Sequence, residues 1–310
     1  MKWIGLSILM LVGSQNILSD NFTVSHNGET IANVNRAYFS NPFIDIPLVN
    51  ENNYEKFIQL LEKAIYQPPV NATLDDNGNI VPEKVGYKLD HDTFTKQFYT
   101  YYFNQGPANI IAPKQMVYPN VDSELLSLIR VKQIGHYTTF FNSGNKERSM
   151  NIKLASEAIN NQVVFPGETF SFNKVVGKRT KEKGYMRAPV IVKGELSEDI
   201  GGGICQISST LYNAVDNAGI TITERYSHSK RVPYVPSGRD ATVSWYGPDF
   251  RFTNKYNQPV LIRSKVYGGT VRIMVYSSED INFKPKRIQK ATYKLPKEIP
   301  LDSEVNRNHL

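Results

Sequence analysis

Apolar side chains recur at intervals of three and four residues from Tyr54 to Ile65, and this pattern ends at Pro68-Pro69. The spacing predicts an amphipathic helix, because positions three and four apart share one helix face. The segment 76–79, Asp-Asn-Gly-Asn, separates two short extended runs and predicts a hairpin turn. A second helix is expected from Asp92 to Phe103. Residues 51–130 are therefore predicted to form a small module of helix, hairpin and helix.

After residue 130 the pattern changes to short extended runs, rich in β-branched and aromatic residues and separated by turn signals. The expected strands are Tyr137–Phe141, the two arms of VVFPGETFSFNKVVG, the hairpin APVIVKGELSEDI, Thr221–Tyr226, Ala241–Trp245, Phe250–Asn254, Val260–Val266 and Thr270–Tyr276. Helical spacing recurs around Ile152–Ile159 and from Cys205 to Ala218, where Gly219 marks a helix end. The fold class is α+β: a small N-terminal helix and hairpin module, then a mainly antiparallel β domain with one central helix headed by Cys205.

Three flanking segments differ in composition from these domains. At the N-terminus one lysine precedes an apolar run of about ten residues, which is typical of a signal peptide and well short of the ~20 residues that span a bilayer. Residues 1–20 are thus a signal peptide or short anchor, with the buried first element of a cytosolic protein as the alternative. Residues 21–50 are polar and predict a loosely packed lead-in, and residues 279–310 predict a basic, disordered tail. We expect an extracytoplasmic protein, secreted or associated with the wall or membrane.

The chain carries a formal net charge of +7, with lysines and arginines spread along its 310 residues and densest near the C-terminus. Outside the cell such a charge favours weak attraction to wall polymers or a membrane surface, although it equally suits a solvated tail. No nucleic-acid partner is expected. The single cysteine excludes an intrachain disulfide. Scattered histidines and the absence of nucleotide-binding motifs predict no metal and no cofactor.

Cys205, the one cysteine, follows Gly201, Gly202 and Gly203 at the head of a predicted helix. A helix N-terminus lowers the pKa of a thiol, and its free N–H groups can stabilise an oxyanion. Glycines allow a substrate to approach the backbone closely. We therefore expect Cys205 to be a nucleophile and the Gln206 amide to help hold the oxyanion. The expected substrate-binding residues beside them are Gly202, Gly203 and Ser208.

A thiol nucleophile needs a base, and His228 is the best placed of the five histidines because it follows a predicted strand after the Cys205 helix. Asp240 comes twelve residues later, at the start of the next predicted strand. This order of cysteine, histidine and carboxylate is the one used by papain-like and transglutaminase-like enzymes. Arg239 is suited to pair with a substrate carboxylate. The alternative is an inert buried cysteine within a hydrogen-bonded core.

Three stretches closely resemble the VanW family domain over about residues 134–268: NIKLASEAINNQVVFPGETFSFNKVVGKRTKEKGYMRAPVI, GGGICQISSTLYNAVDNAG and ERYSHSKRVPYVPSGRDATVSWYGPDFRFTN. Here Ser237 replaces the first residue of the family's usual Pro-Gly-Arg-Asp. The stretch YEKFIQLLEKAIYQPPVNATLDDNGNIVPEKVGYKLD, within about residues 50–116, is similar to a module assigned to peptidoglycan binding that often precedes VanW. We accordingly expect a VanW domain over residues 131–278.

The resemblance implies a bacterial envelope protein of a family named after an accessory gene in vancomycin-resistance clusters and widespread in Gram-positive bacteria. It implies no particular reaction. Two functional hypotheses follow. In the first, Cys205 attacks a peptidoglycan stem peptide, His228 serves as base and Asp240 orients it, giving a peptidase or a transpeptidase-like enzyme. In the second, the chain binds peptidoglycan or another wall polymer as a scaffold, without catalysis.

Overall fold

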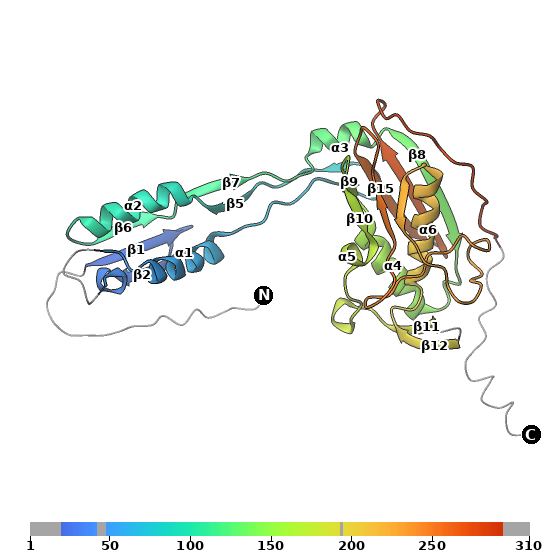
Figure 1. The fold of residues 1–310 in the computed structure, drawn as a ribbon, viewed down its shortest axis with the longest axis horizontal. Coiled ribbons are helices and arrows are strands. Elements are labelled where there is room, and N and C mark those ends of the chain that lie inside the picture. The colour runs from blue at the N-terminus through green and yellow to red at the C-terminus, as the bar shows by residue number, and fades with distance from the viewer. Residues whose placement is uncertain (1–19, 42–47, 193–194, 294–310) are drawn as a thin grey trace, which may run out of the picture. The chain divides into compact units, whose positions relative to one another are not determined.

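The computed structural model describes residues 20–41, 48–192 and 195–293, drawn in colour in Figure 1. The chain divides into two compact units, each with its own core. The first takes in the described residues up to Asn71 together with Glu83–Asn120, and the second takes in Ala72–Pro82 and the chain from Val121 onward. Both contain helices and mainly antiparallel strands, so the α+β fold class is confirmed.

The first unit packs two helices against a three-stranded sheet. Its core is largely aromatic, with Phe22 between rings of Phe57, Phe94 and Phe98 at centroid distances of 5.8 to 6.2 Å. In the sheet, β1 is antiparallel to β2 and parallel to β6, while β5 pairs with β7. The elements are β1 (Asn21–His26), β2 (Glu29–Asn35), η1 (Arg36–Phe39), α1 (Glu51–Ile65), β5 (Gly86–Leu89), α2 (His91–Phe103), β6 (Ala108–Ile111) and β7 (Lys114–Val117).

Residues 21–50 were expected to form a loose lead-in, and for the part from Asn21 to Phe39 this expectation is wrong. Strand β1 buries Phe22 and Val24 completely, and these two alternate positions face the first core. Two apolar positions in six residues are a weak signal, and the parallel partner β6 lies more than 80 residues further along the chain. Residues 42–47 fall outside the described part of the chain.

The hairpin expected around residues 76–79 is present as β3 (Thr73–Leu74) and β4 (Ile80–Val81). It belongs, however, to the second unit rather than to the N-terminal module. The backbone N–H of Leu74 donates to Asn161 Oδ1 at 3.1 Å, and Arg263 donates to the Asp75 carbonyl at 2.8 Å. The hairpin also packs beside α3 (Ser123–Ile129). The chain therefore passes between the units at three points, after Asn71, Pro82 and Asn120, instead of once at residue 130.

The second unit is built on a four-stranded antiparallel sheet in the order β8-β16-β15-β9. Helices α4 and α6 pack against this sheet and against each other (Figure 1). Alternate residues of β15 divide between two cores: Val260 and Ile262 join the core beneath the helices, whereas Leu261 joins the cluster beneath α3. The elements are β8 (Lys132–Phe140), α4 (Lys146–Ile159), β9 (Gln162–Val164), α6 (Ile204–Asn217), β15 (Val260–Tyr267) and β16 (Thr270–Ser277).

The remaining elements of this unit partly correct the expected strand pattern. The arms of VVFPGETFSFNKVVG enter different sheets, because β9 pairs with β15 and β10 pairs with β14, and the NKVV part is helical. The expected hairpin β11–β12 is present, but Ala241–Trp245 lies in a loop and forms no strand. The elements are β10 (Thr169–Ser171), α5 (Phe172–Val176), η2 (Lys181–Lys183), β11 (Arg187–Val192), β12 (Glu195–Ile200), β13 (Thr221–Glu224) and β14 (Arg251–Thr253).

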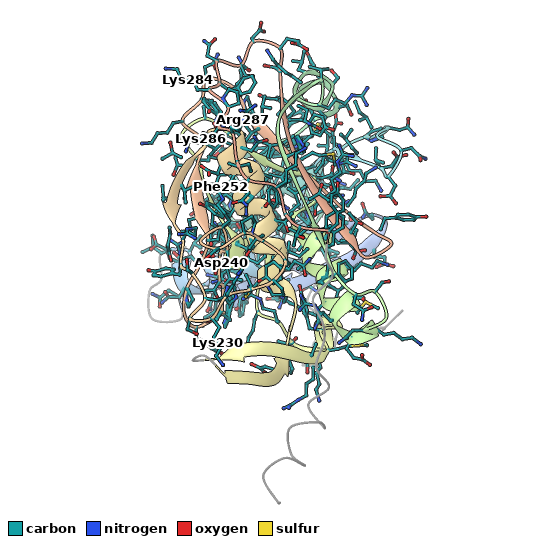
Figure 2. The ribbon with its side chains drawn as sticks, turned by 90° about the vertical axis from the view of Figure 1, so that its right-hand side faces the viewer. Lys230, Asp240, Phe252, Lys284, Lys286 and Arg287 are labelled. Atoms are coloured by element: carbon teal, nitrogen blue, oxygen red, sulfur yellow. The ribbon has the colours of Figure 1, made fainter. Side chains whose placement is uncertain are left out.

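The segment 281–293 has no regular secondary structure but packs against the second unit, contrary to the disordered tail expected from residue 279. Ile281 and Ala291 are buried in the main core, and the N–H of Lys286 donates to the Asn217 carbonyl at 2.9 Å. Figure 2 shows Lys284, Lys286 and Arg287 beside one end of α6. Residues 294–310 and the expected signal peptide or anchor, residues 1–19, lie outside the described residues. Within the described ranges, no helix is both long and apolar enough to cross a membrane.

Candidate functional site

The head of α6 is formed by a glycine turn. Gly201 and Gly203 have φ values of +95° and +104°, which residues with a side chain rarely adopt. Gly203 is the N-cap residue of α6, and no side chain caps the helix there. A Cβ atom at Gly203 would lie 3.0 Å from Cγ1 of Ile152. The glycines are therefore explained by the turn and by its close packing on α4, and they leave the first N–H groups of α6 without a side-chain cap.

Cys205 is the second residue of α6 and is partly exposed. Its Sγ lies 3.5 Å from the carbonyl oxygen of Val243 and 3.8 Å from Oγ1 of Thr242. Both partners belong to the loop between β13 and β14, the region in which a strand was expected. The β-branched residues of that segment thus pack on the head of α6 instead of pairing in a sheet.

His228 and Asp240 come from the same loop and form a close ion pair. His228 Nδ1 is 2.7 Å from Asp240 Oδ2, and the backbone N–H of His228 donates to the same oxygen at 2.6 Å. Both side chains are nearly buried, with exposed fractions of 7% and 9%. Figure 2 shows Asp240 away from the end of α6 where Lys284, Lys286 and Arg287 lie. With Nδ1 on the carboxylate, Nε2 is the ring nitrogen left to face another group.

The imidazole of His228 and the thiol of Cys205 shift each other's pKa values. Burial alone would raise the pKa of the Cys205 thiol, but hydrogen bonding to His228 and its positive charge outweigh burial and lower that pKa below its usual value. Burial likewise opposes the charge on His228, yet the hydrogen bonds to Asp240 and Cys205 raise the pKa of His228 to about 9. The Asp240 pKa is lowered by the same imidazole against the effect of burial. This electrostatic pattern favours the pairing of a thiolate with an imidazolium.

The arrangement can therefore supply a nucleophile, a proton carrier and a group that fixes the imidazole tautomer. It does not resemble a metal site. Across the part of the chain that the structure describes, no group of three or more His, Cys, Asp or Glu side chains could hold a metal ion.

Gln206 and Ser208 are placed differently from the sequence-based expectation, because both side chains are buried. The Gln206 amide donates to Thr139 Oγ1 at 3.1 Å and to the Phe140 carbonyl at 3.0 Å. Ser208 Oγ donates to the Cys205 carbonyl at 3.1 Å and also bonds the Ala241 carbonyl. These bonds hold α6 against β8 and against the loop that carries Asp240. Gly202 is also buried, and its carbonyl accepts a hydrogen bond from Asn151 at 3.0 Å.

Arg239, expected to meet a substrate carboxylate, has protein partners instead. Its Nη2 lies 2.8 Å from Asp216 Oδ2, its Nε donates to Asn213 Oδ1 at 2.7 Å, and its guanidinium lies 4.7 Å from the Tyr212 ring centroid. Asp216 also pairs with Lys286 at 2.8 Å. These bonds attach the Asp240 loop and the C-terminal segment to α6.

Two residues near the thiol were missed by the sequence analysis. Arg179 and the buried Tyr234 both lie close enough to Cys205 for their charges to interact with it. Burial raises the pKa of Tyr234 well above its ordinary value, so this side chain stays neutral. Arg179 lies in the run KRTKEK, whose composition indicates an exposed turn, and no sequence signal distinguishes it from the other charged residues there.

Comparison with known proteins places the site within a recognised domain. The family described as VanW like protein matches residues 147–276, a range that contains Cys205, His228 and Asp240. The protein YoaR of Bacillus subtilis (strain 168), described as uncharacterized, is 56% identical over 291 residues, which cover 94% of this chain and 96% of YoaR. The chain belongs to the VanW family.

A second VanW relative is more distant. The Vancomycin B-type resistance protein VanW of Enterococcus faecalis (strain ATCC 700802 / V583) is 33% identical over 124 residues, which cover 38% of this chain and 45% of that protein. No solved structure matches the chain.

Proposed function

We propose that this VanW protein is an exported cell-envelope enzyme that uses Cys205 for acyl transfer or hydrolysis on peptidoglycan stem peptides. The observation that carries the proposal is the arrangement of Cys205, His228 and Asp240, in which a buried carboxylate orients an imidazole next to a thiol of lowered pKa. The name of the Enterococcus faecalis relative, a vancomycin resistance protein, supports an envelope role. The apolar run near the N-terminus supports export or attachment to the membrane surface.

In this mechanism, Sγ of Cys205 attacks the substrate carbonyl, forming a C–S bond and an oxyanion. The backbone N–H of Cys205 is the donor at the head of α6 for this oxyanion, because the N–H groups of Ile204 and Gln206 already donate to the carbonyls of Gly201 and Gly203. His228, holding the thiol proton, transfers it to the leaving amine as the C–N bond breaks, which leaves a thioester. Water or an acceptor amine then attacks the thioester, His228 takes up the proton of that nucleophile, and the thiol is restored. Asp240 keeps Nδ1 occupied throughout, so that Nε2 carries the transferred proton.

The first unit is proposed to contact the wall polymer. A cavity of about 350 Å³ is lined by residues of α2 and the segment 104–110, including Lys96, Gln97 and Asn104. The Gln97 Oε1 atom is buried and has no hydrogen-bond partner among the described residues. Because Gln97 Oε1 is closed to solvent, the side chains that a peptide or sugar group could reach in this cavity are those of Lys96 and Asn104.

The decisive test is the rate of Cys205 alkylation by iodoacetamide as a function of pH, in the wild type and in His228→Ala. The proposal expects alkylation of the wild type with a midpoint below the ~8.5 of a free thiol, and a higher midpoint in His228→Ala. Purified stem peptides and cross-linked wall fragments would then be incubated with the wild type and Cys205→Ala. A thiol that reacts only after unfolding would exclude the enzyme and favour the alternative, a wall-binding protein without catalysis.

A further inference from the structure

Arg179 is a half-buried cation close to the thiol that the mechanism above does not use. Its Nη2 donates to Asn173 Oδ1 at 2.8 Å, whereas its Nη1 is buried and has no hydrogen-bond partner among the described residues. Leaving a guanidinium nitrogen buried and unpaired is costly, and natural proteins avoid it. Such a group therefore calls for a functional explanation.

The side chain of Arg179 packs against the glycine turn that begins the Cys205 helix, α6. Its Cβ and Cγ atoms lie against the glycine turn, 3.3 and 3.2 Å from the position that a Cβ on Gly201 would take. A larger residue at Gly201 would displace the arginine. Asn173, which holds Nη2, also donates to the carbonyls of Ser244 and Pro248 at 2.9 and 3.1 Å. Arg179 is thus fixed between the turn that begins α6 and the loop that contacts Sγ.

We propose that Arg179 is a positioning residue of the Cys205 site, whose guanidinium stabilises the thiolate through space and keeps the nucleophile ionised. The neutral thiol faces the carbonyl of Val243, and Nη1 of Arg179 has no hydrogen-bond partner among the described residues, so the guanidinium gains a further counter-charge when the sulfur loses its proton. A substrate anion is a weaker candidate for this counterpart, because Nη1 is closed to solvent. The inference deepens the proposed function and rests on it.

The electrostatics agree with this assignment. Burial lowers the pKa of Arg179, and the largest compensating interaction is with the ionised sulfur of Cys205, ahead of those with Tyr185 and Asp249. Other ionisable side chains also act on the thiol or on its neighbours. They are His228, Asp240, Arg148 and Tyr234. His228 is the main source of positive charge acting on Cys205, and Arg179 adds a smaller contribution to it.

The test compares iodoacetamide alkylation of full-length wild type, Arg179→Gln, Arg179→Lys and Lys178→Gln between pH 5 and 10, with melting temperatures recorded for each. We expect Arg179→Gln to slow alkylation at pH 6.5 by about 3- to 10-fold and to move the midpoint upward. Arg179→Lys should recover most of the rate. Lys178→Gln, which removes the neighbouring exposed charge, should match the wild type. If Arg179→Gln does not fold, Arg179→Met replaces it.

The outcomes separate this inference from the proposed function. A normal midpoint in Arg179→Gln together with a raised one in His228→Ala would overturn the role of Arg179 and leave the enzyme proposal intact. A lower melting temperature without any shift of the midpoint would show that Arg179 only holds the loop through Asn173, and would also overturn the inference. An unactivated thiol in the wild type would overturn both proposals.

Discussion

His228 donates its backbone N–H to Asp240 Oδ2 at 2.6 Å while its ring Nδ1 lies 2.7 Å from the same oxygen. One carboxylate oxygen thereby fixes both the chain and the ring of the histidine. Because the ring cannot turn without losing the second bond, Nε2 keeps a constant direction. The loop between β13 and β14 has no strand to hold it in this region, so the two bonds replace a sheet as the means of placing the imidazole.

Asp240→Asn should lower the pKa of His228, because the amide keeps the shape of the carboxylate but lacks its charge. In the wild type the carboxylate helps to raise that pKa to about 9, against the effect of burial. We expect the imidazole resonances of the variant to titrate at lower pH in NMR spectra. Asp216→Asn is the matched control: it removes a carboxylate that pairs with Arg239 and Lys286, and should leave the His228 titration unchanged. An unaltered titration in Asp240→Asn would show that Asp240 only holds the backbone of His228, by accepting its N–H.

The His228 pair should also make stability depend on pH. The folded pKa of about 9 exceeds the unfolded value of 6.5, so the stabilisation is complete below pH 6.5 and is lost as pH rises through 9. Cys205, whose folded pKa is lowered, contributes in the opposite sense, with stabilisation present above its unfolded pKa and lost as pH falls through the folded one. The contribution of His228 to stability should therefore be measured in a Cys205→Ala background, in which the opposing contribution of the thiol is absent.

In that background only Asp240 raises the His228 pKa, because the hydrogen bond and the charge of Cys205 are gone, and the stabilisation is lost, as pH rises, already below pH 9. The melting temperatures of proteins with His228 and with His228→Gln should differ most near pH 6 and least near pH 9.5. The pH-dependent part is on the order of 2–3 kcal/mol at most. Differential scanning calorimetry at half-unit intervals measures it. A difference that does not vary with pH would mean that the imidazole is not charged in the folded protein.

The glycine turn gives a stability prediction that is independent of chemistry. Gly203→Ala places a Cβ at φ +104° and 3.0 Å from Cγ1 of Ile152, so we expect a loss of about 2–4 kcal/mol in the free energy of unfolding. Gly238→Ala is the matched control, because φ is +74° and nothing lies within 4 Å of the added atom. Strain alone should cost about 1 kcal/mol there. Equal losses in urea denaturation would show that the packing of the turn on α4 contributes nothing.

The parts of the fold and site that the sequence predicted are those determined by local spacing. Helix α6 and the position of Cys205 in its first turn followed from the glycines, the apolar periodicity and the closing Gly219. His228 was selected by elimination and chain order, and in the structure it pairs with Asp240 and lowers the pKa of the Cys205 thiol. Their catalytic roles remain predictions.

The parts that were missed depend on distant residues. The β-branched residues Thr242 and Val243 are typical of a strand, yet they contact the Cys205 thiol at the head of α6 instead of pairing in a sheet. Strand β1 was overlooked because its parallel partner β6 is more than 80 residues away. Arg179 was missed since nothing local distinguishes a half-buried arginine from an exposed one.

Arg239 provides the last prediction, because its two interpretations have different consequences. Its guanidinium pairs with Asp216 and donates to Asn213, and its carbonyl accepts a hydrogen bond from the Asn213 amide at 2.7 Å. Arg239→Met keeps much of the side-chain volume but leaves Asp216 with Lys286 alone. Since the pair is only partly exposed, we expect a loss of roughly 2 kcal/mol in the free energy of unfolding.

If Arg239 serves only to pair with Asp216 and Asn213, Arg239→Met should retain the wild-type pH midpoint for Cys205 alkylation. It should also retain the wild-type KM for any wall fragment that proves to be a substrate. A substrate-binding role predicts a different result. KM for a fragment with a free carboxylate would rise at least about tenfold, while KM for the same fragment with that carboxylate amidated would change little, because only the charged fragment loses a partner. Steady-state kinetics on the paired fragments, at a temperature well below the melting point of the variant, separates a binding defect from partial unfolding.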